Sequence, residues 1–241
     1  MNGRTGLLCV IAAVGMLIGG LASAQESGGW TCLFGGSQED LDKHWTWRAP
    51  RPGKPKPGRK PWTPGKWHVL EDGSLECLPR CGYIWSKEQY GDFILDFEVK
   101  VSKKANSGLF FRADPKNCVQ GGMEIQILDS HGKKTPSRHD MGALYDCAAP
   151  RENKAKPAGT WQRMVLTAKG NWIAVELNGM TVLNVDLDKW TEAKKNPNGS
   201  KNKFRTAYKD MPRTGHIGFQ DHGQKIWLRN IKIKRIVEPV P

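Results

Sequence analysis

The sequence predicts an all-β fold in which two antiparallel sheets pack as a sandwich or jelly roll. Three observations support this. Many short segments alternate apolar and polar residues, turn residues such as Asn-Gly separate them, and no segment sustains the helical period of about 3.6 residues. The chain of 241 residues suffices for one such domain, because β-sandwiches reach about 200–250 residues. Such folds commonly present one curved face to a ligand.

The predicted strands begin with a hairpin of residues 67–70 and 74–77 around the turn Glu71-Asp72-Gly73. Residues 93–101 alternate most regularly, with apolar side chains at every odd position, as expected of a half-buried antiparallel strand. Asn178-Gly179 predicts a second hairpin, since a type I′ turn needs positive φ at both central residues. Further strands are predicted over 108–113, 123–128, 161–168, 172–177, 180–185, 215–220 and 226–236, and one short helix over 187–195.

The first 24 residues read as a signal peptide. Arg4 supplies a positive charge, residues 7–18 are largely apolar, and Leu21-Ala22-Ser23-Ala24 ends in an Ala-x-Ala cleavage pattern. Cleavage there starts the mature chain at Gln25 and predicts export, to the periplasm or outside the cell. The apolar segment is shorter than the about 20 residues that span a bilayer, and no longer one follows, so no transmembrane segment is expected.

Residues 25–241 are predicted to form a single domain with a basic, Pro-rich insertion at 48–66. That insertion holds seven Lys or Arg and six Pro without an acid, and residues 189–209 hold seven more Lys or Arg in a chain of net charge +13. Two interpretations stay open for these loops: solvated surface, or an anchor on an anionic envelope polymer. A nucleic-acid partner is not expected, because no recognisable nucleic-acid-binding motif occurs.

Cysteine usage leaves the pairing open. Removal of Cys9 with the signal peptide leaves Cys32, Cys77, Cys81, Cys118 and Cys147. Bridges are plausible after export, with Cys77–Cys81 and Cys118–Cys147 as candidates. Zinc is the rival, but only one close pair exists and no His follows at finger spacing. No phosphate loop, dinucleotide fingerprint, zinc-protease or calcium-loop pattern occurs, so no metal and no organic cofactor is expected.

Ionisable residues gather where a strand pattern would place core. On strand 123–128, Glu124 and Gln126 share the face opposite to the apolar odd positions. Asp129 ends that strand, and Tyr145 follows in an acidic segment. Arg112 ends the strand before it, where it either forms a structural salt bridge with Glu124 or holds a developing oxyanion. Carboxylates suit proton abstraction or hydrogen bonding to sugar hydroxyls, although an exposed pair without a role is the plain alternative.

A second polar segment follows strand 215–220. Gln220 lies on the parity opposite to the apolar residues, and Asp221-His222-Gly223 reads as a turn. His222 could donate a proton to a leaving oxygen, although a lone His is more often structural. Asn106, in the predicted turn Asn106-Ser107-Gly108, either caps that turn or binds a ligand.

At these residues the chain resembles an exported bacterial family, the 3-keto-disaccharide hydrolases, also described as 3-keto-glucoside 1,2-lyases and 3-keto-2-hydroxy-glucal hydratases. The matching motifs run through nearly the whole mature chain in order. They are residues 30–36, Trp45, 90–95, 106–112, 124–129, 142–145, 156–161, 177–179, 218–223 and 228–233. The basic insertion and the cysteine set depart from the family pattern.

The resemblance implies a concanavalin-like jelly roll that acts, without a cofactor, on glycosides already oxidised at C3. A ketone at C3 acidifies the C2 proton, so the chemistry needs a base, an enolate stabiliser and an acid. The hypothesis assigns Glu124, Arg112 and His222 to these roles in that order. The substrate-binding residues are then Gln126, Asp129, Tyr145, Gln220, Asp221 and Asn106. A non-catalytic glycan-binding module of the cell envelope is the alternative function.

Overall fold

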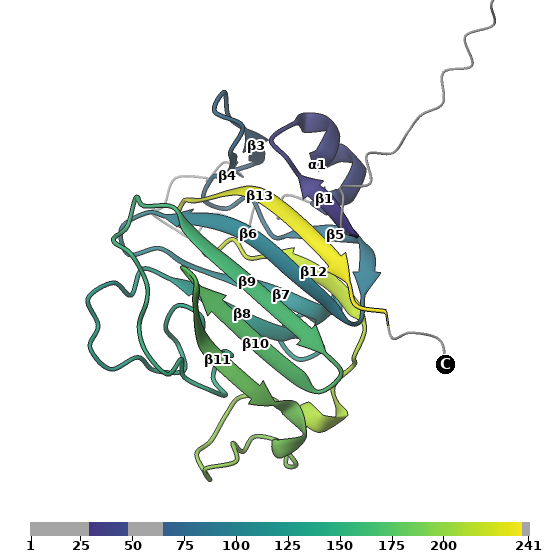
Figure 1. The fold of residues 1–241 in the computed structure, drawn as a ribbon, viewed down its shortest axis with the longest axis vertical. Coiled ribbons are helices and arrows are strands. Elements are labelled where there is room, and N and C mark those ends of the chain that lie inside the picture. Colours follow the sequence, from purple (N-terminus) through teal and green to yellow (C-terminus); the bar gives the residue numbers. More distant parts are fainter. Residues whose placement is uncertain (1–28, 48–64, 238–241) are drawn as a thin grey trace, which may run out of the picture.

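The structure, a computed structural model, describes residues 29–47 and 65–237. The predicted signal peptide and nearly all of the predicted basic insertion lie outside the described residues. Within those ranges the chain forms two antiparallel sheets, one of eight strands and one of five, packed face to face (Figure 1). None of the helices in the described ranges has the length and apolar character needed to cross a bilayer.

The eight-stranded sheet has the order β11-β10-β9-β6-β13-β4-β3, and β1 also pairs with β13. Alternation of polar and apolar side chains along β6 and β9 buries one face of this sheet and leaves the other half-exposed. Its strands are β1 (Trp30–Phe34), β3 (Trp67–Val69), β4 (Leu75–Cys77), β6 (Phe93–Val101), β9 (Gln162–Lys169), β10 (Trp172–Leu177), β11 (Met180–Asp186) and β13 (Ile226–Arg235).

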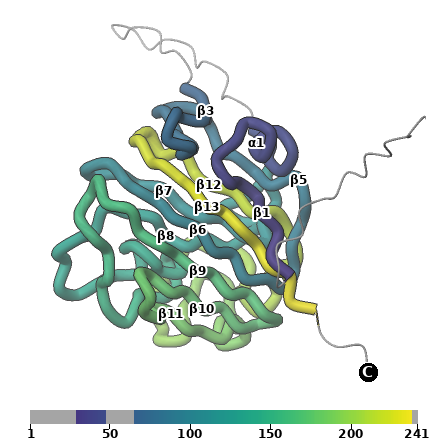
Figure 2. Tube along the Cα trace, turned by 45° about the horizontal axis from the view of Figure 1, so that its top comes forward, coloured from purple at the N-terminus to yellow at the C-terminus, as the bar shows by residue number. Residues whose placement is uncertain are grey.

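The five-stranded sheet has the order β2-β5-β12-β7-β8 and lies behind β6, β9 and β13 in Figure 1. Figure 2 shows the helix α1 (Gln38–His44) beside β1 and β5, at one end of the sandwich. The strands of this sheet are β2 (Trp45–Trp47), β5 (Ile84–Tyr90), β7 (Asn106–Ala113), β8 (Met123–Leu128) and β12 (Gly215–Phe219).

The core lies between the two sheets, and a smaller apolar cluster lies on the far side of the five-stranded sheet. Phe97 of β6 and Phe219 of β12 meet edge to face across the interior, with ring centroids 5.2 Å apart. The smaller cluster is formed by Trp85, Phe110 and Ala113, with Tyr83 and Cys118 packed against it. Apolar clusters on an outer face often mark a binding site. The second cluster therefore makes the outer face of the five-stranded sheet a candidate binding surface.

The predicted strands are confirmed. Polar and apolar residues alternate wherever a strand has one buried face, so the sequence pattern identifies such strands. The Asn178-Gly179 turn has φ of 54° and 84°, as a type I′ hairpin requires. β7 begins two residues earlier than predicted, so Asn106 is a strand residue opposite Leu128 rather than part of a turn.

The helices were predicted wrongly. The predicted helix at 187–195 is only a 3₁₀ turn, η1 (Leu187–Lys189); a second one, η2 (Tyr208–Asp210), packs beside it. The helix α1 escaped prediction because it is seven residues long and buries only Leu41, which is too little for a periodic signal. Its start is fixed locally: the Ser37 hydroxyl accepts a hydrogen bond from the Asp40 backbone N–H at 3.0 Å.

None of the five cysteines in the described ranges forms a disulfide. Cys147 is buried in the main core, whereas Cys118 is half-buried against the smaller outer cluster. The predicted Cys118–Cys147 bridge is therefore wrong, because the five-stranded sheet separates the two clusters. The Sγ atoms of Cys77 and Cys81 do meet, 2.8 Å apart.

Candidate active site

The outer face of the five-stranded sheet, called the Glu124 face below, carries one row of residues in register across four strands. Trp85 of β5 lies opposite Gly218 of β12, Gly218 lies opposite Phe110 of β7, and Phe110 lies opposite Glu124 of β8. Side chains directly opposite each other on antiparallel strands share a face. The row therefore places an indole, a phenyl ring and a carboxylate side by side.

Two glycines make this arrangement fit. A Cβ atom on Gly108 would overlap the Glu124 carboxylate, and one on Gly218 would overlap the indole of Trp85. Both glycines have ordinary strand conformations, so the requirement is space and not backbone freedom. The Glu124 carboxylate therefore packs on the backbone of β7 at Gly108, and the Trp85 indole packs on the backbone of β12 at Gly218.

Glu124 is the chemically distinctive residue of this face. Only 5% of it is exposed, and no group in the described ranges donates a hydrogen bond to its carboxylate. Burial raises the pKa of Glu124 from its ordinary 4.5 to about 7, and the positive charge of Lys203 opposes that rise. A carboxyl group with a pKa near neutrality exchanges a proton readily, which is what a general base requires.

Amide side chains continue the polar face beside Glu124. Gln126 Nε2 donates to Asn106 Oδ1 at 2.8 Å. Gln126 Oε1 is buried and has no hydrogen-bond partner among the described residues. Gln220 Nε2 donates to the Tyr83 hydroxyl at 3.1 Å. A buried acceptor without a donor is costly, so a ligand hydroxyl that reached Gln126 would be bound favourably.

The aromatic side chains of this face form one contiguous group. The rings of Tyr83 and Phe110 stack with centroids 5.7 Å apart, and those of Trp85 and Phe110 lie 5.8 Å apart at 39°. Aromatic rings offer flat apolar surface to the C–H faces of sugars, while amides and carboxylates bind the hydroxyl groups. The combination suits a carbohydrate.

The loop that contains Ala143 and Tyr145 hydrogen-bonds to the free edge of β8 and brings Tyr145 next to Glu124. The backbone N–H of Tyr145 donates to the carbonyl of Glu124 at 2.9 Å. The Lys203 Nζ lies 4.1 Å above the centre of the Tyr145 ring. Burial and the Glu124 charge both raise the pKa of Tyr145, so its phenol stays protonated at neutral pH.

Asp146 holds this loop in place. Its Oδ2 accepts from the Lys203 backbone N–H at 2.8 Å, and its Oδ1 lies 3.0 Å from His139 Nε2. The His139 ring packs against Tyr145 with centroids 5.0 Å apart. One carboxylate therefore fixes the two flanking segments, which positions Tyr145 and Lys203 relative to Glu124.

Arg112 does not take part, and its predicted role as enolate stabiliser is wrong. The guanidinium is fully buried and donates to the Gly91 carbonyl, the Gly170 carbonyl and the Asp92 carboxylate at 2.7–2.9 Å. The reason is a β-bulge. The β7–β12 register shifts between His216 and Gly218, and Arg112 has φ of 47°.

The bulge turns Arg112 away from the Glu124 face. It leaves Phe110 and Ala113 together on the outer side, while Arg112 joins turns at the end of the sandwich. Neither predicted pairing, with Glu124 or with an oxyanion, is then available to this side chain.

Three further predicted residues have other partners, or none, among the described residues. Asp129 accepts from the Lys104 N–H at 2.8 Å and lines a different cavity with Trp227. The carboxylate of Asp221 is occupied by the backbone N–H groups of Gly82 and Gly223. His222 is exposed in the loop two residues beyond Gln220, and no described residue hydrogen-bonds its ring. Its role as an acid stays a prediction.

The structure thus brings together Glu124, Gln126, Asn106, Gln220 and Tyr145 from the sequence prediction. It adds five residues that sequence reasoning missed: Tyr83, Trp85, Phe110, Gly108 and Lys203. The parity of β7 and β8 already pointed to Phe110 and Gly108. Lys203 lies in an irregular loop, where no periodic signal exists.

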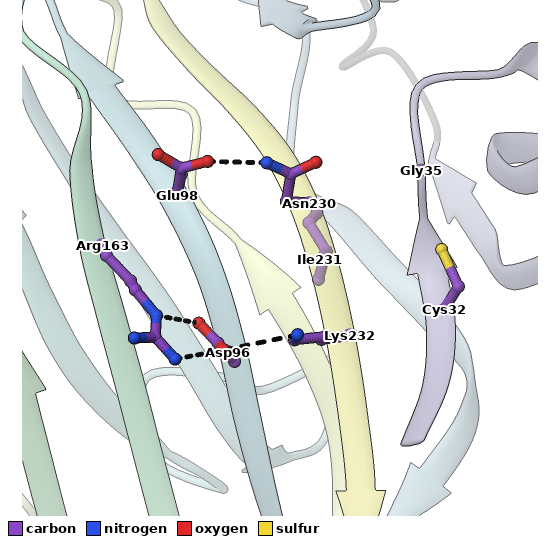
Figure 3. Close-up of a pocket in the computed structure, with 8 residues that line it drawn as sticks. All are labelled: Cys32, Gly35, Asp96, Glu98, Arg163, Asn230, Ile231 and Lys232. Atoms are coloured by element: carbon purple, nitrogen blue, oxygen red, sulfur yellow. Dashed lines mark hydrogen bonds and ion pairs between the residues drawn. The ribbon is translucent and has the colours of Figure 1, made fainter. Parts of the chain in front are cut away.

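A cavity of about 350 Å³ lies on the other sheet, away from Glu124 (Figure 3). Its carboxylates are neutralised locally: Arg163 binds Asp96 through two nitrogens at 2.7–2.9 Å, and Arg229 and Asn230 bind Glu98. Such pairing suits stability more than reaction. The remaining lining residues are Cys32, Gly35, Ile231 and Lys232.

One cluster in the described ranges has the composition of a metal site. Cys77, Cys81 and Asp221 offer two sulfur atoms and a carboxylate oxygen within 4.8 Å of one another. The cluster adjoins the Glu124 face. Gln220 directly precedes Asp221 in sequence, and Tyr83 lies two residues after Cys81.

Comparison with known proteins agrees with this fold. The architecture is a jelly-roll β-sandwich, as predicted, and it is similar to a galectin-like protein from Bacillus subtilis, with a TM-score of 0.52 at 15% identity over 86% of this chain and 97% of that one. A crystal structure of a Parabacteroides distasonis ATCC 8503 protein assigned to the glycosyl hydrolases is more similar, with a TM-score of 0.71 and 30% identity. That match covers 86% of this chain and 99% of the other.

Residues 29–234 match the 3-keto-alpha-glucoside-1,2-lyase-like domain family, and the chain belongs to that family. It is also 27% identical over 208 residues to a 3-keto-disaccharide hydrolase of Bacteroides thetaiotaomicron, a match that covers 71% of this chain and 70% of that protein.

Proposed function

We propose that this chain is an enzyme that cleaves 3-keto-glycosides on the Glu124 face, with Glu124 as the general base. The observation that carries the proposal is a buried carboxylate without a salt-bridge partner and with a pKa of about 7, beside an aromatic group and a row of amides. Membership of the lyase-like family and the likeness to a 3-keto-disaccharide hydrolase support the substrate class.

The proposed reaction has two halves. The C3 ketone makes the C2–H bond acidic, and Glu124 takes that proton to form an enolate. The enolate re-forms the ketone as the C1–O bond breaks, which leaves a C1–C2 double bond. The departing oxygen takes a proton from a general acid, the role predicted for His222, and the aglycone leaves as an alcohol. Water then adds its hydroxyl to C1 and gives its other proton back to that acid, while the protonated Glu124 returns a proton to C2, so the net change is hydrolysis.

Lys203 and Tyr145 take the stabilising role that the sequence had assigned to Arg112. Both lie on the β8 edge beside Glu124, and Lys203 is the cation whose charge acts on that carboxylate. A nearby cation and a neutral phenol stabilise negative charge that develops on the substrate oxygens. Tyr83, Trp85 and Phe110 then carry the apolar face of the sugar ring.

The test uses a purified 3-keto-disaccharide, with the unoxidised disaccharide as control and no added cofactor. We expect cleavage of the first sugar only, and deuterium from heavy water at C2 of the product. Cleavage without deuterium at C2, together with equal rates for substrates that carry hydrogen and deuterium at C2, would contradict proton abstraction there. Saturable binding of both sugars without turnover would favour a glycan-binding module, the function that the aromatic group could serve without Glu124.

We also propose that the protein is exported, on the strength of the cleavage pattern that ends at Ala24. Expression in a bacterium with a secretory pathway should yield a protein whose mass matches a start at Gln25. A full-length cytoplasmic product would contradict this.

A further inference from the structure

Cys77 and Cys81 belong to a cluster that the proposed reaction does not use. Both side chains are fully buried, and their sulfur atoms lie 2.8 Å apart, closer than the about 3.5–4.0 Å at which even carbon atoms pack. Asp221, from a loop far away in sequence, places a carboxylate oxygen within 4.8 Å of both. Two buried thiols and a half-buried acid that meet at one point need an explanation other than packing.

The spacing of these three atoms fits one small cation. A tetrahedral zinc ion holds sulfur at about 2.3 Å and oxygen at about 2.0–2.2 Å, which puts neighbouring ligand atoms roughly 3.5–3.8 Å apart. The observed separations, from 2.8 to at most 4.8 Å, bracket that value. Side-chain rotation alone could bring the three atoms to the distance that zinc requires.

Charge and ligand type point the same way. Among the described residues, no cation pairs with the Asp221 carboxylate, which accepts only from two backbone N–H groups. Thiolates select soft or borderline cations such as zinc over calcium and magnesium.

We propose that Cys77, Cys81 and Asp221 form a binding site for a thiophilic divalent cation, for which Zn²⁺ is the test ion. The cation would join two segments that carry residues of the Glu124 face. Gly82, which binds Asp221, precedes Tyr83, and Asp221 follows Gln220; Tyr83 and Gln220 hydrogen-bond each other. The site is therefore structural: it fixes the aromatic and amide edge without touching the sugar.

This site could not be recognised from spacing alone. Cys77 and Cys81 are one close pair without a histidine at finger spacing, and the third ligand comes from the other end of the chain. A disulfide between the two cysteines is the competing outcome. It would use both sulfurs but leave the Asp221 carboxylate beside a neutral bond, whereas a cation uses all three groups.

The experiment uses the purified full chain, reduced with a phosphine, stripped of metal and titrated with zinc chloride. We expect one equivalent of zinc per chain by elemental analysis, a rise in Tm on binding, and a thiolate-to-metal absorption band with cobalt(II). Cys77→Ser, Cys81→Ser and Asp221→Asn should each weaken zinc binding by more than about 100-fold. Cys118→Ser, outside the cluster, should bind zinc as the native chain does.

Three results would overturn the proposal: no zinc bound by the reduced chain, zinc binding unchanged in Asp221→Asn, or zinc binding lost in Cys118→Ser. A Cys77–Cys81 disulfide that re-forms in air and excludes zinc would replace it with the competing outcome. If a cysteine variant does not fold, Asp221→Asn and the cobalt spectrum still decide. Metal content is read without substrate, so failure here leaves the proposed function untouched.

Discussion

Glutamates on the outer faces of the two sheets have pKa values that are shifted in opposite directions. On the eight-stranded sheet, Glu98 is held by Arg229 and Asn230, and these contacts lower its pKa. On the five-stranded sheet, Glu124 has no such partner, and burial raises its pKa to about 7. Both residues are glutamates within β-strands, so the difference comes from their neighbours and not from the side chain itself.

Strand register explains the contrast. Glu98 of β6 lies opposite Arg163 on one neighbouring strand and Arg229 on the other. Glu124 of β8 lies opposite Phe110, and on its other side is the loop that carries Tyr145. A carboxylate between cations is a surface ion pair, whereas one between an aromatic ring and a loop is desolvated and can exchange its proton.

The largest expected effect is from Glu124→Gln. Removal of a general base should lower kcat/KM on a 3-keto-disaccharide by about 10²–10⁴-fold. The variant should be at least as stable as the native chain, because no buried charge remains. Turnover with purified substrate and thermal unfolding measure the two quantities.

Glu98→Gln is the matched control on the other face. It should leave kcat/KM within about twofold of native. It should lower the free energy of unfolding by about 1 kcal/mol or less, because the broken ion pair is partly exposed. If both glutamine variants lost activity equally, the contrast between the two faces would have no bearing on catalysis.

A smaller effect is expected from Gly108→Ala. The new Cβ overlaps the Glu124 carboxylate and must displace it. A displacement of about 1 Å at a reacting group costs roughly 10²-fold in rate, so kcat should fall while KM changes little. Steady-state kinetics on the folded variant measures this.

Gly218→Ala tests whether an effect of Gly108→Ala comes from displacement of Glu124 or from crowding of the sheet by an added methyl group. It displaces the Trp85 indole, which is proposed to bind sugar, so KM should rise more than kcat falls. Equal losses of kcat in both variants would show that any added methyl group disturbs the sheet.

The sequence predicts most strands of this fold well, because the alternation of polar and apolar residues is a local pattern that one sequence shows. It also places Glu124 and Gln126 on one face correctly, since both lie within the unbroken strand β8. It fails at Arg112, where the bulge inverts the parity after Phe111, and a bulge leaves no mark in polar and apolar alternation. It fails likewise for Lys203, which the loop fold and not a pattern brings to Glu124.

The pH dependence of stability should differ between the two faces. Glu124 has a folded pKa of about 7, above its ordinary 4.5, so the folded state binds more protons than the unfolded state between these values. Its contribution therefore falls as pH rises from about 4.5 to 7, by at most about 3 kcal/mol. Glu98 has a lowered folded pKa and contributes in the opposite sense, with stability lost as pH falls.

Denaturant unfolding across this pH range tests the difference. The stability of Glu124→Gln relative to the native chain should grow between pH 4.5 and 7, and that of Glu98→Gln should not. A flat difference for Glu124→Gln would mean that its carboxyl titrates as an exposed one does.

Lys203→Met should lower kcat modestly, because Lys203 is also proposed to stabilise the enolate, and should shift the pH profile. Lys203 lowers the pKa of Glu124, so its removal should raise that pKa further and move the acidic limb of the kcat/KM profile to higher pH. The loop should keep its fold, because Asp146 binds the backbone N–H of Lys203 and not its side chain. Lys201→Met, in the same loop, removes an equal charge that does not act on Glu124 and should leave the profile in place. A uniform loss of rate without a shift would mean that Lys203 stabilises the enolate alone. A shift shared by both variants would mean that the net charge of the loop, and not the position of Lys203, sets the basicity of Glu124.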